Sequence, residues 1–263
     1  MVAVIFSFLP VRDRFRSGSV CRKWRQAYLH PACWRQADLS DVGKEMDCEK
    51  IAMAVILLSR GQLRSLSLRY CNDSLFELIG KHCPLLEQIR IAKSHLLRGV
   101  YSPDPPSISV IKAFVDGCPR LRSLDLKIDL RVEKKQLSEF VRTLVSGFRD
   151  LVALHLDVES VVFVGEGQGQ GQGLPQVLCS YLYIDVADIR LIVANLPNLE
   201  VLGLRRAVVT DAGLELIGKG LPRLRCLTLH GCFPLTWQAV NALMSARRDI
   251  RVAAEGSIRF PGI

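Results

Sequence analysis

Cysteine and histidine are the residue types in this chain that could bind a metal or act as a nucleophile. The 263-residue sequence contains nine cysteines and five histidines. No two cysteines have the C-x-x-C spacing of zinc knuckles and redox centres. The histidines are isolated from one another, without an H-x-x-x-H pattern or a His/Asp/Ser order. The sequence therefore predicts no catalytic residue, no metal site and no cofactor.

A glycine-rich segment at residues 165–173 (GEGQGQGQG) is the other place where chemistry could be sought, because glycine-rich loops bind phosphates. A phosphate-binding loop needs a following G-K-S/T, or a strand-to-helix turn with an acidic residue some twenty positions on. Neither accompanies this segment. Glycine-rich segments without such a frame behave as flexible linkers, so we interpret residues 165–173 as a flexible insertion.

The cysteines are better interpreted as small hydrophobic residues. They are scattered, odd in number and mostly lie within apolar periodic segments, whereas disulfide scaffolds are typical of short secreted chains. The longest uncharged apolar run, Ile51 to Ser59, is far shorter than the ~18–20 residues that span a bilayer. We therefore expect no membrane association and a location in the nucleus, the cytoplasm or both.

The spacing of leucines after residue 60 is the most informative pattern in the chain. It follows L-x-x-L-x-L-x-x-N/C, which is the signature of a leucine-rich repeat, a strand followed by a helix. One such unit cannot bury its own apolar edge, so successive units must stack. The pattern predicts an α/β leucine-rich-repeat solenoid with short parallel strands on its concave face and helices on its convex face. Its clearest copies contain Leu63, Leu66, Leu68 and Cys71; Leu121, Leu124 and Leu126; Leu199, Leu202 and Leu204; and Leu224, Leu227, Leu229 and Cys232.

The intervals between copies indicate where the repeats are irregular. The first apolar positions, 63, 86, 121, 151, 199, 224 and 250, are separated by 23, 35, 30, 48, 25 and 26 residues. A repeat usually has about 20–29 residues, so the interval of 48 predicts a degenerate copy. Residues Cys179 to Ile184, followed by the helical pattern of Val186 to Leu196, would supply it. Prolines in Tyr101 to Ser109 mark an irregular loop within the interval of 35.

The residues that flank the second and third leucines should face the concave side, since side chains alternate along a strand. This face is polar and weakly basic. It could bind a protein segment with acidic or phosphorylated groups, which arginine recognises through two parallel hydrogen bonds. It could equally be a strand face kept soluble by charge, and Asp125 and Asp157 weaken the binding interpretation. The predicted substrate-binding residues are Arg69, Arg90, Lys127, His155, Arg205 and His230.

Positive charge is concentrated at the N-terminus. Of a net charge of +9, residues 1–40 contribute +5, from seven Lys and Arg against Asp13 and Asp38. A solvated helix face, a docking surface for an acidic partner and a mitochondrial presequence could each produce this balance. Two tryptophans and two prolines count against a presequence, because they imply packed helices with defined breaks.

Residues 1–40 resemble an F-box, the helical module that binds the Skp-family adaptor of cullin ubiquitin ligases. The matching segments are Ile5 to Pro10 (IFSFLP), Arg12-Asp13, Val20 to Arg25 (VCRKWR), and Trp34 followed by Asp38-Leu39-Ser40. An F-box normally begins with Leu-Pro and an acidic residue, and only Met1 to Val4 precede Ile5 here, so the module is expected to be shortened. The resemblance implies that the adaptor-binding residues are Ile5, Leu9, Pro10, Val20, Cys21 and Trp24.

The remaining chain is similar to the cysteine-containing leucine-rich repeats that follow many F-boxes, an arrangement especially common in plants. Thr210 to Cys232 is nearly a consensus copy. We therefore expect an all-α F-box-like module at 1–40 and a solenoid at 41–263.

The resemblance implies a non-catalytic, substrate-recognition subunit of a Skp–cullin–F-box ubiquitin ligase, acting in protein degradation. Its partners would be the adaptor, through it a cullin, and an unknown protein substrate. The alternatives are a repeat scaffold that no longer binds the adaptor, and nucleic-acid binding through the basic helices. We do not expect nucleic-acid binding, because the basic residues alternate with apolar ones that the F-box resemblance already explains.

Overall fold

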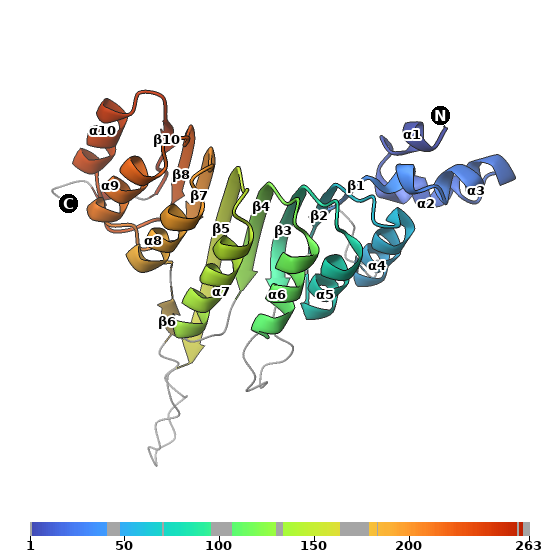
Figure 1. Cartoon of the computed structure of the whole chain (residues 1–263), viewed down its shortest axis with the longest axis horizontal. Coiled ribbons are helices and arrows are strands. Elements are labelled where there is room, and N and C mark those ends of the chain that lie inside the picture. Colours follow the sequence, from blue (N-terminus) through green and yellow to red (C-terminus); the bar gives the residue numbers. More distant parts are fainter. Residues whose placement is uncertain are drawn as a thin grey trace, which may run out of the picture.

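The computed structural model describes residues 2–40, 48–69, 71–95, 107–129, 134–163, 179–182, 184–256 and 258–259. A small helical module at the N-terminal end is followed by a row of strands with helices along one side (Figure 1). The predicted α/β leucine-rich-repeat solenoid behind a small all-α module is confirmed.

The N-terminal module packs around aromatic side chains. It consists of α1 (Val2–Phe6), α2 (Val11–Ser17), α3 (Arg22–Tyr28) and the short 3₁₀ helix η1 (Pro31–Trp34). Trp34 is fully buried, its indole Nε1 donates to the Tyr28 carbonyl at 2.7 Å, and its ring meets those of Phe15 and Tyr28. Pro10 stands at the N-cap of α2. It fixes an extended approach to the helix, as its ring requires.

Eight parallel strands form the main sheet, in the order β1-β2-β3-β4-β5-β7-β8-β10. The second leucine of each repeat lies beside its counterpart, from Leu66 through Ile89, Leu124, Leu154 and Leu202 to Leu227. The last part of the segment expected to be all-α forms β1, the edge strand of this sheet. The strand bounds are β1 (Gln36–Leu39), β2 (Ser65–Leu68), β3 (Gln88–His95), β4 (Ser123–Asp129), β5 (Ala153–Phe163), β7 (Val201–Arg205), β8 (Cys226–His230) and β10 (Arg251–Ala253).

Helices cover one face of this sheet and bury its leucines. Several begin at a polar side chain that accepts a hydrogen bond from the first turn, as at Asn72, Asp185 and Thr210. Phe76, Phe114 and Phe148 contact one another edge to face across three successive repeats. The helix bounds are α4 (Cys48–Ser59), α5 (Asp73–His82), α6 (Ile108–Gly117), α7 (Lys134–Gly147), α8 (Val186–Asn195), α9 (Asp211–Gly220) and α10 (Trp237–Ala246).

The prediction of an additional, degenerate repeat copy near residue 180 is wrong. Strand β6 (Cys179–Leu182) pairs antiparallel with the far end of β5, and β5 pairs directly with β7 in the main sheet. The long interval arises because β5 continues past its neighbours and β6 returns alongside it (Figure 1). The predicted flexible insertion at 165–173 and residues 101–106 of the predicted loop lie outside the described residues. A second small sheet pairs β9 (Leu235–Thr236) with β11 (Ile258–Arg259).

Glycines allow α5 and α6 to approach closely. A β-carbon on Gly117 would lie 1.8 Å from the carbonyl oxygen of Gly80, and one on Gly80 would lie 2.5 Å from that of Ala113. The obstructing atoms are backbone atoms, which cannot rotate away as a side chain can. Close packing of these two helices therefore requires glycine at both positions.

The substitution Gly117→Ala should lower the free energy of unfolding by about 1–3 kcal/mol, because α5 and α6 must move apart. Gly213→Ala in α9 is the matched control, since its β-carbon would lie no nearer than 3.5 Å to any neighbour. It should be neutral or stabilise the protein by up to about 1 kcal/mol. Urea unfolding of the two variants provides the measurement, and equal effects would contradict this account of the packing.

Candidate interaction surfaces

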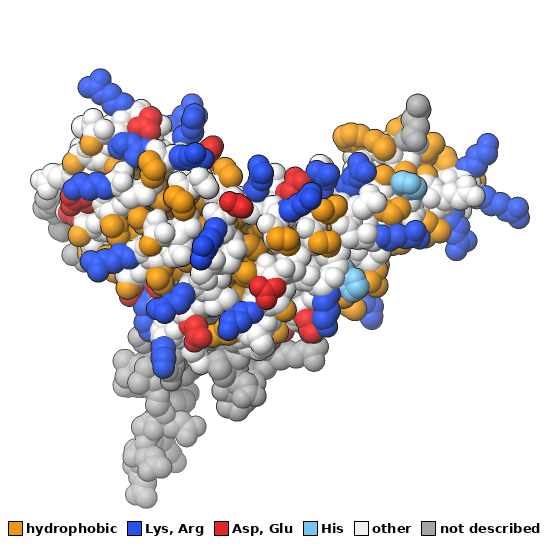
Figure 2. Space-filling model, viewed as in Figure 1, with side chains coloured by type: hydrophobic (Ala, Val, Ile, Leu, Met, Phe, Trp, Pro, Cys, Tyr) orange, Lys and Arg blue, Asp and Glu red, His pale blue; other side chains and the backbone are white. Residues whose placement is uncertain are grey.

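Exposed apolar side chains mark the N-terminal module. Ile5 is 57% exposed, Val20 is 62% exposed and Trp24 is 41% exposed, although Trp24 also contacts the buried ring of Phe6 at 5.2 Å between centroids. Pro10 and Cys21 are exposed as well, and Leu9 is half-buried. The six predicted adaptor-binding residues are thus surface residues, five of them exposed. Hydrophobic side chains gather over α1 in Figure 2.

The sequence interpretation missed Phe8, the most exposed large hydrophobic residue of the module at 83%. It lies two residues beyond the end of α1, three and four positions after the exposed Ile5 and Val4. This is the spacing of one helical face, so the periodicity of the segment could have identified it. Its exposure adds a large apolar group to the same surface.

The sequence interpretation also missed that one of the N-terminal arginines is buried. Arg14 is only 5% exposed, and burial lowers its pKa. Its guanidinium donates to four carbonyl oxygens, those of Ser7 (2.6 Å), Leu9 (2.8 Å), Cys33 (2.9 Å) and Gln36 (2.6 Å). It also lies 5.6 Å from the centroid of the Trp34 ring. Arg14 thereby joins α1, α2 and η1 to β1, the first strand of the solenoid.

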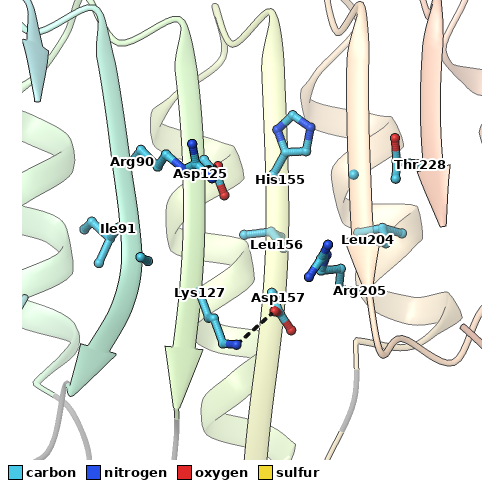
Figure 3. A pocket seen from close by; sticks show the side chains of 12 residues that line it. Arg90, Ile91, Asp125, Lys127, His155, Leu156, Asp157, Leu204, Arg205 and Thr228 are labelled. Carbon is cyan, nitrogen blue, oxygen red and sulfur yellow. Dashed lines mark ion pairs between the residues drawn. The ribbon is translucent and has the colours of Figure 1, made fainter. Parts of the chain in front are cut away.

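Two rows of side chains on the concave face of the sheet carry most of its charged residues. The central row runs from Ser67 through Arg90, Asp125, His155 and Gly203 to Thr228, and a second runs from Lys127 through Asp157 and Arg205 to His230. A shallow pocket of ≈ 460 Å³ opens between these two rows. Its lining includes Arg90, Lys127, His155 and Arg205 (Figure 3).

The structure brings together four of the six predicted substrate-binding residues. His230 lies in the second row and Arg69 directly follows β2, and neither lines the pocket. The positive charges of two of the four are partly neutralised by ion pairs, since Arg90 lies 3.2 Å from Asp125 and Lys127 lies 3.7 Å from Asp157. The pocket is therefore less basic than a count of its arginine and lysine residues suggests.

Arg206 adds a cation that the repeat pattern does not predict at this face. Its backbone adopts a left-handed conformation (φ 51°), which costs a residue with a side chain about 1–2 kcal/mol. Its Nε and Nη2 donate to Oδ1 of the buried Asp157 at 3.0 and 2.6 Å. In a continued strand the side chain of residue 206 would point into the core, because that of Arg205 is exposed. The left-handed backbone at Arg206 turns its side chain toward Asp157 instead.

The repeat cysteines have structural surroundings. Cys71 and Cys232 are buried, and the Cys232 thiol donates to the Leu204 carbonyl at 3.3 Å, which confirms the predicted structural role of this position. Burial raises the pKa of Cys83 and of Cys118 to about 12. Thiols with such values carry almost no thiolate near neutral pH and are poor nucleophiles.

The described residues contain no group of three or more His, Cys, Asp or Glu side chains that could hold a metal ion. Within the same ranges, no helix combines the length and apolar character needed to cross a membrane.

Comparison with known proteins found a family match at the N-terminus and a similar protein over most of the chain. The F-box-like family matches residues 2–40. The Arabidopsis thaliana protein named "Putative F-box/LRR-repeat protein 22" is 24% identical over 238 residues, covering 88% of this chain. The chain spans 66% of the length of that relative.

Two solved structures resemble the chain at low overall similarity. A Bacteroides fragilis protein has a TM-score of 0.37 at 16% identity, over 84% of this chain and 65% of its own. A structure of Rad7 and Elc1 in complex, from yeast, has a TM-score of 0.40 at 13% identity, over 93% of this chain and 69% of the matched one.

Replacing Arg14 by methionine tests its role as the junction between the module and the solenoid. The variant keeps an apolar stem but leaves four carbonyls without their donor, so the free energy of unfolding should fall by at least about 3 kcal/mol. Arg16→Met on the same helix is the control, because Arg16 is exposed and makes only a surface ion pair with Asp13. Urea unfolding followed by tryptophan fluorescence measures both, and equal losses would refute the proposed junction.

Proposed function

Since the chain joins an F-box-like module to leucine-rich repeats, we propose that it is a substrate-recognition subunit of a Skp–cullin–F-box ubiquitin ligase. The F-box-like module implies an adaptor of the Skp1 type as partner. The repeats would hold the target protein and the adaptor would connect it to the cullin. Ubiquitin transfer would take place on other subunits, so this chain contributes effective concentration rather than catalysis. We expect it to act in the nucleus, the cytoplasm or both.

The exposed apolar side chains of the module are the observation that carries this proposal. Ile5, Phe8, Val20 and Trp24 leave a large apolar area in contact with water, although the module has its own buried core. Several large apolar side chains exposed on one small module are typical of a protein–protein interface. Exposed cations on α3, Arg22, Lys23 and Arg25, adjoin it, and such charged rims favour a partner of opposite charge.

The concave face is the natural place for the target. It is polar, it curves along the parallel strands, and it contains the pocket between Arg90 and Arg205. Solenoids use such extended inner surfaces to bind other proteins. Adaptor and target would thus occupy separate parts of the chain, with the module at one end of the sheet (Figure 1).

Phe8→Asp tests adaptor binding with little risk to folding, because Phe8 is almost entirely exposed. Loss of a buried aromatic anchor costs about 2–4 kcal/mol, or roughly 30- to 1,000-fold in affinity. Titration calorimetry with a purified Skp1-type adaptor measures the effect. Phe233→Asp is the matched control, since Phe233 is also exposed but follows β8, near the other end of the main sheet.

If the wild-type chain does not bind the adaptor, the ligase proposal is wrong and a scaffold that only bridges or sequesters proteins becomes the better explanation. If it binds and Phe8→Asp binds equally well, the adaptor uses a different surface.

A further inference from the structure

In the second concave row one carboxylate lies between two basic side chains. Lys127, Asp157, Arg205 and His230 lie side by side in register on β4, β5, β7 and β8. In such a row one would expect Asp157 to form ion pairs with both of its neighbours, Lys127 and Arg205. The observed pairing is different, and it determines which cation is left for a ligand.

The negative charge of Asp157 is balanced by Arg206 and Lys127, not by Arg205. Arg206 donates twice to Oδ1 of Asp157, and the Lys127 ammonium lies 3.7 Å from Oδ2. Asp157 is buried, so these contacts account for both of its oxygens. The unusual left-handed backbone at Arg206 is what places the second guanidinium there.

Arg205 is consequently an uncompensated cation on the pocket lining. It is exposed, and no residue in the described ranges forms a hydrogen bond or an ion pair with its guanidinium. His155 and Thr228, on the strands at either side, also line the pocket without a hydrogen-bond partner among the described side chains. Figure 3 shows these three residues on neighbouring strands around the same hollow.

Gly203 makes room for the imidazole of His155. It lies between His155 and Thr228 in the central row, and a β-carbon there would stand 2.2 Å from Cδ2 of His155. The imidazole therefore occupies space that any other residue at 203 would fill. Glycine at this position thus allows His155 to line the pocket.

We propose that this pocket binds an anionic side chain of the target protein, a carboxylate or a phosphoryl group, with Arg205 as its principal contact. The inference rests on the proposed function and specifies its substrate class. A guanidinium can donate two parallel hydrogen bonds to either anion, and His155 and Thr228 offer further donors. A neutral or cationic segment would instead cover Arg205 and leave a desolvated charge unpaired.

Selection from a displayed library of random twelve-residue peptides tests this inference on the full chain. The wild-type protein should enrich peptides with Asp or Glu at a fixed position. Arg205→Glu should lose that preference, and its far-ultraviolet circular dichroism should be unchanged because Arg205 is exposed. The control is Arg223→Glu, an exposed arginine in the turn before β8 that lines a different pocket. It should select the same acidic peptides as the wild type.

Synthetic copies of one selected peptide then identify the anion. Replacing its acidic residue by the corresponding amide should weaken binding at least tenfold in fluorescence anisotropy, and replacing it by phosphoserine should preserve or strengthen binding. Tighter binding of the phosphoserine copy would indicate phosphorylated targets, and tighter binding of the carboxylate copy would indicate acidic ones.

Selection of peptides without acidic residues, or equal binding of acidic peptides to Arg205→Glu, would overturn the inference and leave the receptor function standing. A wild-type chain that binds the adaptor but enriches no peptide would contradict target binding at this face and the inference with it.

Discussion

The whole solenoid depends on keeping the apolar rows of its strands in register. Each of the six strands between β1 and β10 contributes only two buried leucine or isoleucine side chains, such as Leu66 and Leu68 on β2, which cannot form a core alone. Parallel pairing places Leu66 beside Ile89 and Leu124, and this continues to Leu227. A shift of one residue in any strand would turn its leucines outward, since side chains alternate. The rows of the concave face are fixed by the same alternation, so the buried leucines determine which residues a target can meet.

The N-terminal module is joined to this register by direct contacts. Arg14 donates to the carbonyl of Gln36, the first residue of β1, while β1 pairs with β2 and η1 contacts α4. The arginine also holds Ser7 and Leu9, which flank the exposed Phe8. A single buried guanidinium thus links the apolar surface of the module to the first strand of the solenoid. In a receptor that must hold a target at a set position relative to an adaptor, such a fixed link reduces the conformational freedom lost on assembly.

The sequence was sufficient for features that repeat. Leucine spacing located the strands of the main sheet from β2 to β10, and side-chain alternation placed Arg90, Lys127, His155 and Arg205 on one face. It failed where a local departure from the pattern decides the outcome. The interval of 48 residues suggested a further copy, yet length alone cannot distinguish an additional strand from one strand that continues and a partner that returns antiparallel.

The repeat pattern also could not predict where individual charged side chains lie. Arg14 belongs to a cluster of arginines whose other members are exposed, and its burial depends on four carbonyls that approach from distant parts of the module. The position of Arg206 depends on a left-handed backbone that no repeat consensus indicates. The left-handed backbone is tolerated because Arg206 pairs with the buried Asp157. A buried carboxylate left with too few partners would lower stability by roughly several kcal/mol, which is more than the about 1–2 kcal/mol that a left-handed backbone costs. The strained arginine therefore stabilises the fold, whereas the guanidinium of its exposed neighbour Arg205 forms no hydrogen bond or ion pair with the described residues. Of the two adjacent cations, one is paired within the structure and the other is exposed on the pocket lining.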